Sequence, residues 1–340
     1  MLKIGKDIGV DLGTASVLVT VKGKGIVLNE PSVVAVDIDR NKTLAVGEEA
    51  RRMLGRTPLN ISAIRPLKEG VIADFDTTES MLKHFLYKAT GSNPFFKPRV
   101  MVCVPAGITS VEQRAVMEAV LNTGAKDVFL IEEPRAAALG ADLEIFEPFG
   151  NMVIDIGGGT TDVAVISLGD IVKKDSIRVG GDKLDEAIVR FIRDKHNLMI
   201  GERTAEEIKI QVATADPNTR KKSIEVRGRD IVSGLPKNLT VDSDMAFEAI
   251  KEPVNSILRS AHKVLERTPP ELASDIIDKG IVMTGGGAML HGLDTFLTEK
   301  LRCPVFLAQD PISSVVRGTG IALEMLDNIM DTLTSSKKSV

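Results

Sequence analysis

Two aspartate-glycine turns constrain this chain more than any other feature. The first is Asp11-Leu12-Gly13-Thr14, and the second is Asp155-Ile156-Gly157-Gly158-Gly159-Thr160-Thr161-Asp162. Each follows an apolar, β-branched run and precedes another, at residues 17–21 and 163–166. This order predicts a strand, a tight turn and a second strand at both places. The chain therefore contains the same hairpin twice, each with an acid at its turn.

Such hairpins suit a phosphate ligand that is held together with a metal ion. Glycine lets backbone N–H groups approach phosphate oxygens closely, because it has no Cβ. The carboxylates of Asp11 and Asp155 would repel phosphate, but they would favour a hydrated Mg²⁺ between themselves and a nucleotide. A single glycine-rich hairpin is usually only a turn. Because the hairpin occurs twice, each time with an aspartate, we predict that the two hairpins bind one Mg-nucleotide from two sides. Both aspartates would contact Mg²⁺ through water.

Length and composition exclude several other classes of protein. At 340 residues, with 43% hydrophobic and 26% charged residues, a soluble protein of two domains is expected. The absence of Trp, the single Tyr and the net charge of −4 argue against nucleic-acid binding. Cys103 and Cys303 lie in apolar strand-like runs, which indicates buried free thiols. The four histidines are scattered, so no zinc site is predicted.

Targeting segments are not predicted either. No run approaches the ~20 apolar residues that a membrane span requires. The six residues before the first strand are too few for a signal peptide. We therefore expect a cytoplasmic protein.

Both halves of the chain alternate strands and helices after their hairpin. In the first half, strands are expected near residues 7–11, 15–21, 32–37, 99–104 and 128–131, with helices opening at Asp76, Thr109 and Glu133. In the second half, strands are expected near 152–156, 162–167, 170–179 and 281–283, with helices from Lys183, from Thr204 and across 244–267. Pro253 should kink or split the last of these. The alternation predicts α/β layers with largely parallel core strands.

Several segments resemble a known superfamily. The two hairpins, Ile131-Glu132-Glu133-Pro134 before three alanines, and Thr284-Gly285-Gly286-Gly287 resemble the actin/Hsp70/sugar-kinase superfamily. The segments at 25–32, 64–74 and 201–206 resemble, more narrowly, the MreB/Mbl family of bacterial actin homologues. The likeness covers about residues 5–330, and it does not distinguish between the paralogues of the family.

The resemblance implies an actin-like ATPase fold of the α/β class. Two duplicated RNase H-like α/β domains would surround a nucleotide cleft, each with a smaller inserted subdomain. Domain I would span residues 1–145 and 313–333, with its small subdomain at about 32–75. Domain II would span 146–312, with its small subdomain at about 181–242. Residues 334–340 are expected to form a disordered polar tail.

The resemblance also implies a function. ATP and Mg²⁺ would be bound, and slow hydrolysis would be coupled to polymerisation. The chain would self-assemble into antiparallel double protofilaments on the anionic inner face of the cell membrane, without binding nucleic acid. Its other partners would be the cell-wall elongation machinery and co-assembling paralogues. The filaments would organise lateral cell-wall synthesis and maintain rod shape.

The expected phosphate and water contacts follow the hairpins and the segment after residue 131. Glu133 precedes Pro134, as the corresponding Glu does in the chaperone branch, so it is expected to polarise the attacking water. The alternative is that Glu133 only favours a helix N-terminus, where an acid contributes ~0.3–1 kcal/mol. Thr160 or Thr161 would help to orient the water. The β- and γ-phosphates would be held by backbone N–H and hydroxyl groups of Gly13, Thr14, Ala15, Ser16, Gly157, Gly158, Gly159 and Thr160.

Adenosine is expected between a helix and a second glycine-rich turn. Glu207 could accept hydrogen bonds from ribose hydroxyls, and the glycines would allow a flat approach of the base. Alternatively, Thr204 and Glu207 form a capping box, which would engage Glu207 with its own backbone. The residues expected around the nucleoside are Glu206, Glu207, Ile208, Lys209, Gly285, Gly286, Gly287, Ala288 and Met289.

A proline-bounded loop is the expected membrane contact. Phe95 and Phe96 are adjacent between Pro94 and Pro98, with Lys97 and Arg99 beside them. Exposed aromatic residues next to basic ones suit an anionic lipid surface, and the family resemblance points the same way. The alternative is that both phenylalanines fold back onto the core.

Three other functions remain open at this point. A soluble small-molecule kinase of the same superfamily would transfer phosphate to an acceptor. An Hsp70-like chaperone would require a peptide-binding domain, and none follows residue 330. A scaffold that binds nucleotide without hydrolysing it is the third alternative.

Overall fold

The protein, described here from a computed structural model, divides into two compact units. The structure describes residues 7–40, 42–91 and 97–337, and the side chains as far as residue 326. Unit 1 comprises Met1–Glu147 with Ile312–Val340, and unit 2 comprises Pro148–Pro311. The expected domain boundaries, after residues 145 and 312, lie close to these.

Unit 1 is built on a mixed five-stranded sheet. Its strands, in spatial order, are β10 (Asp127–Glu132), β9 (Arg99–Val104), β1 (Ile8–Leu12), β2 (Ser16–Val21) and β3 (Gly25–Pro31). β10, β9 and β1 are parallel, whereas β1, β2 and β3 are joined as antiparallel neighbours. The parallel strands β1 and β9 are apolar and almost wholly buried, as strands covered on both faces should be. The expectation of a largely parallel core is confirmed for β10, β9 and β1, and only the hairpin strand β2 runs against its neighbours in this sheet.

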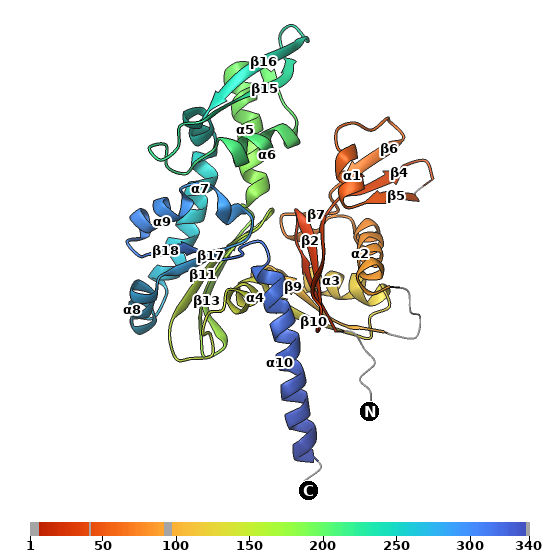
Figure 1. Cartoon of the computed structure of the whole chain (residues 1–340), viewed down its shortest axis with the longest axis vertical. Helices are drawn as coiled ribbons and strands as arrows, with labels where there is room; N and C mark the ends of the chain where they lie inside the picture. Colours follow the sequence, from red (N-terminus) through yellow and green to blue (C-terminus); the bar gives the residue numbers. More distant parts are fainter. Residues whose placement is uncertain (1–6, 41, 92–96, 338–340) are drawn as a thin grey trace. The chain divides into compact units, whose positions relative to one another are not determined.

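Helices cover this sheet and extend from it (Figure 1). They are α2 (Phe75–Thr90), α3 (Ser110–Asn122), α4 (Glu133–Gly140) and α10 (Ser314–Lys337). The capping box of Thr109 and Glu112 is confirmed at α3. At α2 the cap is Asp74, whose side chain accepts from the Thr77 N–H, so this helix begins before the expected Asp76. The helix α10 continues to Lys337, into residues expected to form the tail.

A small sheet with one helix forms the inserted part of unit 1. Its elements are β4 (Val34–Asp37), β5 (Lys42–Val46), β6 (Ile61–Ile64) and α1 (Glu48–Met53). Val33, Ala35 and Ala50 are its own buried core. A two-stranded turn follows, made of β7 (Leu67–Lys68) and β8 (Val71–Ile72).

Unit 2 repeats the sheet plan of unit 1. Its strands, in spatial order, are β13 (Asp170–Ile177), β12 (Thr161–Ser167), β11 (Asn151–Ile156), β17 (Ile281–Thr284) and β18 (Val305–Leu307). β11 pairs antiparallel with β12 and parallel with β17, as β1 pairs with β2 and β9. The two hairpins therefore occupy equivalent places in their sheets.

The rest of unit 2 is helical, with one small sheet. The helices are α5 (Gly181–His196), α6 (Glu202–Gln211), α7 (Ser243–Glu266), α8 (Pro270–Lys279), α9 (Leu293–Leu301) and the short 3₁₀ turn η1 (Gly287–Met289). The sheet consists of β14 (Leu198–Met199), β15 (Ser223–Asp230) and β16 (Pro236–Asp242). Pro253 does not split α7, which runs through it as one helix. Its apolar face buries Ile250, Val254 and Ile257 in the core of the unit.

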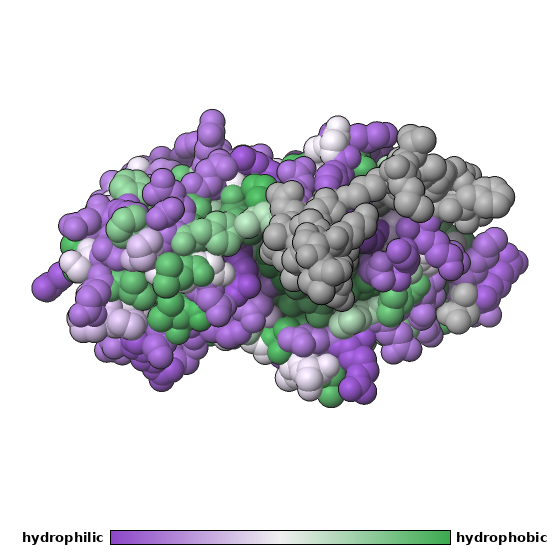
Figure 2. Space-filling model, turned by 90° about the horizontal axis from the view of Figure 1, so that it is seen from below, coloured by the Kyte–Doolittle hydropathy of each residue, from purple (hydrophilic) through white to green (hydrophobic). Residues whose placement is uncertain are grey.

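The helices give no sign of a membrane-spanning segment. Across residues 7–40, 42–91 and 97–337, none of them is both long enough and apolar enough to cross a lipid bilayer. On the face shown in Figure 2, hydrophobic residues are interspersed among hydrophilic ones.

Candidate functional site

Both aspartate-glycine hairpins are closed by the same backbone hydrogen bond. The N–H of Gly13 donates to the carbonyl of Ser16 at 3.1 Å, and the N–H of Gly157 donates to the carbonyl of Thr160 at 2.9 Å. These two amides are therefore occupied within the hairpins. The expectation that Gly13 and Gly157 donate to phosphate has to be revised.

Ser32 fixes the direction of the first hairpin. Its hydroxyl donates to the Gly13 carbonyl at 2.6 Å, and its N–H donates to the Ala15 carbonyl at 3.0 Å. In a trans peptide, a carbonyl and the next N–H point in opposite directions. The amides of Thr14 and Ser16 therefore point away from Ser32. Ser32 is fully buried and was not expected in the site, since only the structure brings it under the hairpin.

The first hairpin also supports the turn between β7 and β8. The Thr14 hydroxyl oxygen accepts from the Gly70 N–H at 3.0 Å. A hydroxyl that accepts one hydrogen bond keeps its own proton for donation. Thr14 can thus hold the Gly70 turn and donate to a phosphate oxygen at the same time.

Helix α5 fixes the second hairpin in the same way. The N–H groups of Gly181 and Asp182 donate to the carbonyls of Gly157 and Gly158, at 3.0 and 2.9 Å. The amides of Gly158 and Gly159 consequently face away from α5. A Cβ on Gly180 would lie 2.6 Å from both hairpin carbonyls, so this close approach requires glycine. Each hairpin thus turns two backbone N–H groups away from the residues that support it, and such groups can bind an anion.

The two aspartates lie beside these donors and each has a hydrogen-bond donor of its own. Asp155 is buried, and its Oδ1 accepts from the Thr284 hydroxyl at 2.6 Å. Oδ1 of Asp11 lies 3.4 Å from Cys103 Sγ. Oxygen atoms, such as those of carboxylates, are the ligands that Mg²⁺ prefers. Among the described residues, no three His, Cys, Asp or Glu side chains are grouped to ligate a metal.

The ionisation of Asp11 gives a testable pH dependence. Desolvation raises the pKa of this carboxyl from 3.8 to about 6, against the opposing hydrogen bond from Cys103. The folded protein therefore holds this proton more tightly than the unfolded chain. The resulting stabilisation is complete below pH 3.8 and is lost as the pH rises through 6.

We expect Asp11→Asn to remove this dependence. Without nucleotide, the wild type should gain about 1 kcal/mol of unfolding free energy relative to Asp11→Asn between pH 7 and pH 5. At pH 7 the variant should be the more stable protein, because it no longer buries a charge. Urea unfolding at both pH values measures the difference. If the unfolding free energies of the two proteins changed equally with pH, the raised pKa of Asp11 would be contradicted.

Glu133 lies at the same sheet edge as Asp11. β10 and β1 both pair with β9, with Ile131 and Asp11 each opposite Cys103, and Glu133 follows at the start of α4. Burial raises the pKa of the Cys103 thiol well above its usual range, and the charges of Asp11 and Glu133 raise it further. Glu133 is itself buried, with 8% exposed. The N-cap of α4 is Glu132, no side chain caps this end, and Glu133 is the acid of the first turn, where it also favours the helix N-terminus.

The two threonines of the second hairpin differ in their surroundings. The Thr161 hydroxyl donates to the Val179 carbonyl at 2.6 Å, and the residue is fully buried. This hydroxyl supports the hairpin, so Thr160 is the better candidate for orienting water.

The expected adenosine helix differs in part from its prediction. The helix α6 begins at Glu202 after Gly201 and has no side-chain cap, so the capping box of Thr204 and Glu207 was wrong. Glu207 is exposed and accepts only a long bond, of 3.2 Å, from Gln211. Its carboxylate is therefore accessible to a further hydrogen-bond donor. The Ile208 side chain is fully buried in the core, where it cannot face a ligand.

Lys209 connects α6 to α5. Its Nζ donates to Asp185 Oδ2 at 2.7 Å and to the Gly181 carbonyl at 3.1 Å. Desolvation raises the pKa of Asp185 to about 6, although Lys209 lowers it. The Gly181 N–H in turn donates to the Gly157 carbonyl, so Lys209 supports the second hairpin through Gly181.

The glycine-rich turn after β17 packs against the second hairpin. Gly285 has a φ of +83°, and a Cβ there would lie 2.3 Å from the Ile156 carbonyl oxygen. A Cβ on Gly287 would lie 2.5 Å from the Ile156 side chain. The missing side chains of these glycines thus make room for packing on β11. A Cβ on Gly286 would meet no atom within 4 Å, and Met289 is 54% exposed, whereas Ala288 is buried.

The predicted membrane residues, Phe95 and Phe96, lie outside the described residues. Of their basic neighbours, Lys97 is exposed. Arg99 is engaged instead by Asp7, with 2.9 Å between Nε and Oδ1. Lys97 is therefore the basic group of this segment that a lipid headgroup could meet.

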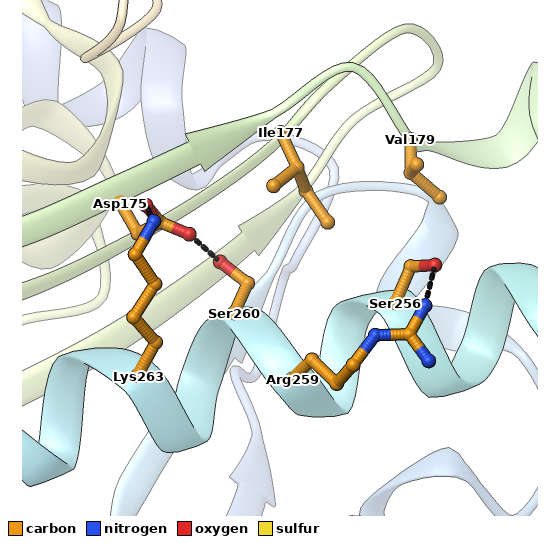
Figure 3. Close-up of a pocket in the computed structure, with 7 residues that line it drawn as sticks. All are labelled: Asp175, Ile177, Val179, Ser256, Arg259, Ser260 and Lys263. Carbon is orange, nitrogen blue, oxygen red and sulfur yellow. Dashed lines mark hydrogen bonds and ion pairs between the residues drawn. The ribbon is translucent and has the colours of Figure 1, made fainter.

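A separate pocket in unit 2, of about 320 Å³, lies between β13 and α7 (Figure 3). Its charged groups are paired with one another or with neighbours: Asp175 accepts from Ser260 and Lys263, and Arg259 donates to Ser256 and Glu252. No residue expected in the nucleotide site lines it. The lining residues are Asp175, Ile177, Val179, Ser256, Arg259, Ser260 and Lys263.

Comparison with known proteins gives a consistent result over nearly the whole chain. The family model described as MreB/Mbl protein matches residues 5–331. The cell shape-determining protein Mbl of Bacillus subtilis (strain 168) is 60% identical over 334 residues, covering 98% of this chain and 99% of that protein. The cell shape-determining protein MreB of Escherichia coli (strain K12) is 53% identical over 327 residues, 94% of each chain.

A solved structure is similar over the same extent. The crystal structure of MreB 5 of Spiroplasma citri bound to AMPPNP has a TM-score of 0.92 and 37% sequence identity to this chain. The match covers 97% of this chain and 99% of that one.

Proposed function

The chain belongs to the MreB/Mbl family, and on that premise we propose that it is a filament-forming ATPase that acts at the membrane. Its actin-like α/β fold is the one expected. In this proposal the chain binds and slowly hydrolyses Mg-ATP, and its filaments organise lateral cell-wall synthesis and so maintain rod shape. It works from the cytoplasmic face of the membrane, together with the cell-wall elongation machinery and with paralogues.

The observation that carries the proposal is the equivalence of the two hairpins. In each, donors from outside the hairpin hold its carbonyls, so the following amides face the other way and are available to an anion. Each also has an aspartate at its first strand. Two such groups on one chain fit the two sides of a nucleotide polyphosphate.

Different groups of the two hairpins bind the phosphates and the metal ion. The amides of Thr14, Ser16, Gly158 and Gly159 hold the β- and γ-phosphates. Asp11 and Asp155 would hold the water shell of a bound Mg²⁺, which would supply positive charge to offset that of the phosphoryl oxygens. Related proteins support a nucleotide ligand, since MreB 5 of Spiroplasma citri has been solved with AMPPNP and with ADP.

Hydrolysis requires a water molecule held in line with the terminal phosphate. Glu133 is the acid of unit 1 placed next to Asp11, and we assign to it the polarisation of this water, with Thr160 as an orienting group. On the nucleoside side, Glu206 and Glu207 of α6 and the turn at Gly286 and Met289 contact adenosine. These roles are consistent with the exposure of Glu207 and the open space at Gly286.

Filament formation on lipid gives the direct test of this function. The purified protein is examined by negative-stain electron microscopy on anionic and on neutral lipid, with Mg-ATP and without nucleotide. Paired filaments lying on anionic lipid only with Mg-ATP are expected. Single particles in all four conditions, from a protein that does bind ATP, would contradict the proposal and favour the soluble small-molecule kinase.

A further inference from the structure

The residue beside each hairpin aspartate occupies the same position in the two units. In unit 1, β1 and β9 are parallel neighbours and place Cys103 opposite Asp11. In unit 2, β11 and β17 are parallel neighbours and place Thr284 opposite Asp155. The duplicated sheet thus puts a side-chain donor next to each aspartate, but the two donors differ chemically.

The two donors also differ in how firmly they hold their aspartate. Thr284 is fully buried, and its hydroxyl donates to Asp155 Oδ1 at 2.6 Å, a short charge-assisted bond. Cys103 Sγ lies 3.4 Å from Asp11 Oδ1 and 3.3 Å from the Val10 carbonyl. A thiol has one weakly acidic proton, so these two acceptors share a poor donor. Only Asp155 is held by a strong side-chain donor on its neighbouring strand.

We propose that Thr284 is a positioning residue for the metal side of the nucleotide site: its hydroxyl fixes the orientation in which Asp155 meets the hydrated Mg²⁺. This inference rests on the proposed function. Thr284 also directly precedes Gly285, whose backbone packs against Ile156. The end of β17 therefore orients Asp155 and leads into the turn that we assign to adenosine.

The hydroxyl can be separated from the shape of the side chain by substitution. Thr284→Val keeps the β-branched shape and removes the donor, whereas Thr284→Ser keeps the donor. Partners that orient metal-binding groups typically contribute 10–100-fold to metal affinity. We therefore expect Thr284→Val to weaken ADP binding about 10-fold or more in Mg²⁺. In EDTA its ADP affinity should remain close to that of the wild type, and Thr284→Ser should behave like the wild type in both conditions.

Calorimetric titration of ADP, in Mg²⁺ and in EDTA, tests the inference. Thr268→Val is the matched control, because Thr268 is another buried threonine of unit 2, whose hydroxyl donates to the Val264 carbonyl at 2.8 Å. It should not change either affinity. Equal losses in Mg²⁺ and in EDTA for Thr284→Val would indicate general damage and overturn the inference, as would wild-type affinity in Mg²⁺.

Three further outcomes are distinguished. If Thr284→Val does not fold, Thr284→Cys replaces it. Because a thiol is a weaker donor than a hydroxyl, a Mg²⁺-specific loss relative to Thr284→Ser is expected, and no such loss would count against the inference. If the wild type itself fails to bind Mg-ADP, the proposed function fails. If the wild type binds and Thr284→Val binds equally well, only the positioning role of Thr284 fails.

Discussion

A Glu133→Gln variant is expected to bind Mg-ATP with near wild-type affinity and to hydrolyse it about 100-fold more slowly, or slower still. Glutamine keeps the size of the side chain but cannot accept a proton or polarise water as a carboxylate does. Glu133 is buried at the edge of the sheet, beside Asp11 and Cys103, where its charge acts in a poorly solvated environment. The loss should therefore appear in the rate of hydrolysis and not in binding.

Single-turnover hydrolysis at equal filament mass measures this effect without interference from assembly. Glu132→Gln is the matched control, because Glu132 is the neighbouring acid and occupies the N-cap of α4. It should hydrolyse ATP at the wild-type rate. Wild-type turnover in Glu133→Gln would remove Glu133 from the mechanism, and a wild type without hydrolysis would identify the chain as a binding-only scaffold.

A Gly318→Ala variant is expected to lose about 2 kcal/mol or more of unfolding free energy in unit 1. The helices α4 and α10 approach one another so closely that a Cβ on Gly318 would lie 1.8 Å from the Ala136 carbonyl oxygen. On the facing helix, a Cβ on Gly140 would lie 1.7 Å from the Ser314 carbonyl oxygen. Both obstacles are backbone atoms, so no side-chain rotation can relieve them. The helices would have to separate, which outweighs the ~1 kcal/mol that Ala gains over Gly within a helix.

Gly320→Ala, two residues further along α10, is the control. Its Cβ would lie 3.3 Å from the nearest atom, a methyl carbon of the Thr20 side chain, which can adjust. Its denaturation midpoint should stay close to that of the wild type, while that of Gly318→Ala falls. Because α4 begins with Glu133, the loosened contact should also slow hydrolysis. Equal midpoints for the two variants would show that the helices can separate at little cost.

The parts of the site that depend on local sequence could be predicted from it. Both hairpins, their aspartates and the start of α4 at Glu133 were expected, because glycine, proline and β-branched runs act within a few residues. The edge strand β3 was not predicted, since only Leu28 of its seven residues is buried. The fold as a whole came from the resemblance to a family, and local patterns alone indicated only α/β layers.

The remaining features depend on contacts between distant residues. That the Gly13 and Gly157 amides close their own hairpins follows from strand register, which a sequence pattern does not specify. Ser32 and Thr284 support the hairpins from positions 19 and 129 residues away from their acceptors. Gly285 and Gly287 were assigned to the base, but their missing side chains make room for Ile156. The sequence around a glycine or a threonine does not show which distant residue it will contact.

Binding of one Mg-nucleotide by both hairpins is tested by calorimetric titration of Mg-ADP into the wild type, Asp11→Asn, Asp155→Asn and the double variant. We expect one nucleotide per chain and a loss of about 10-fold or more for each single variant. The double variant should lose less than the product of the two single losses, because both aspartates act on the same ion. Two nucleotides per chain, or an affinity that either single substitution leaves unchanged, would contradict the account.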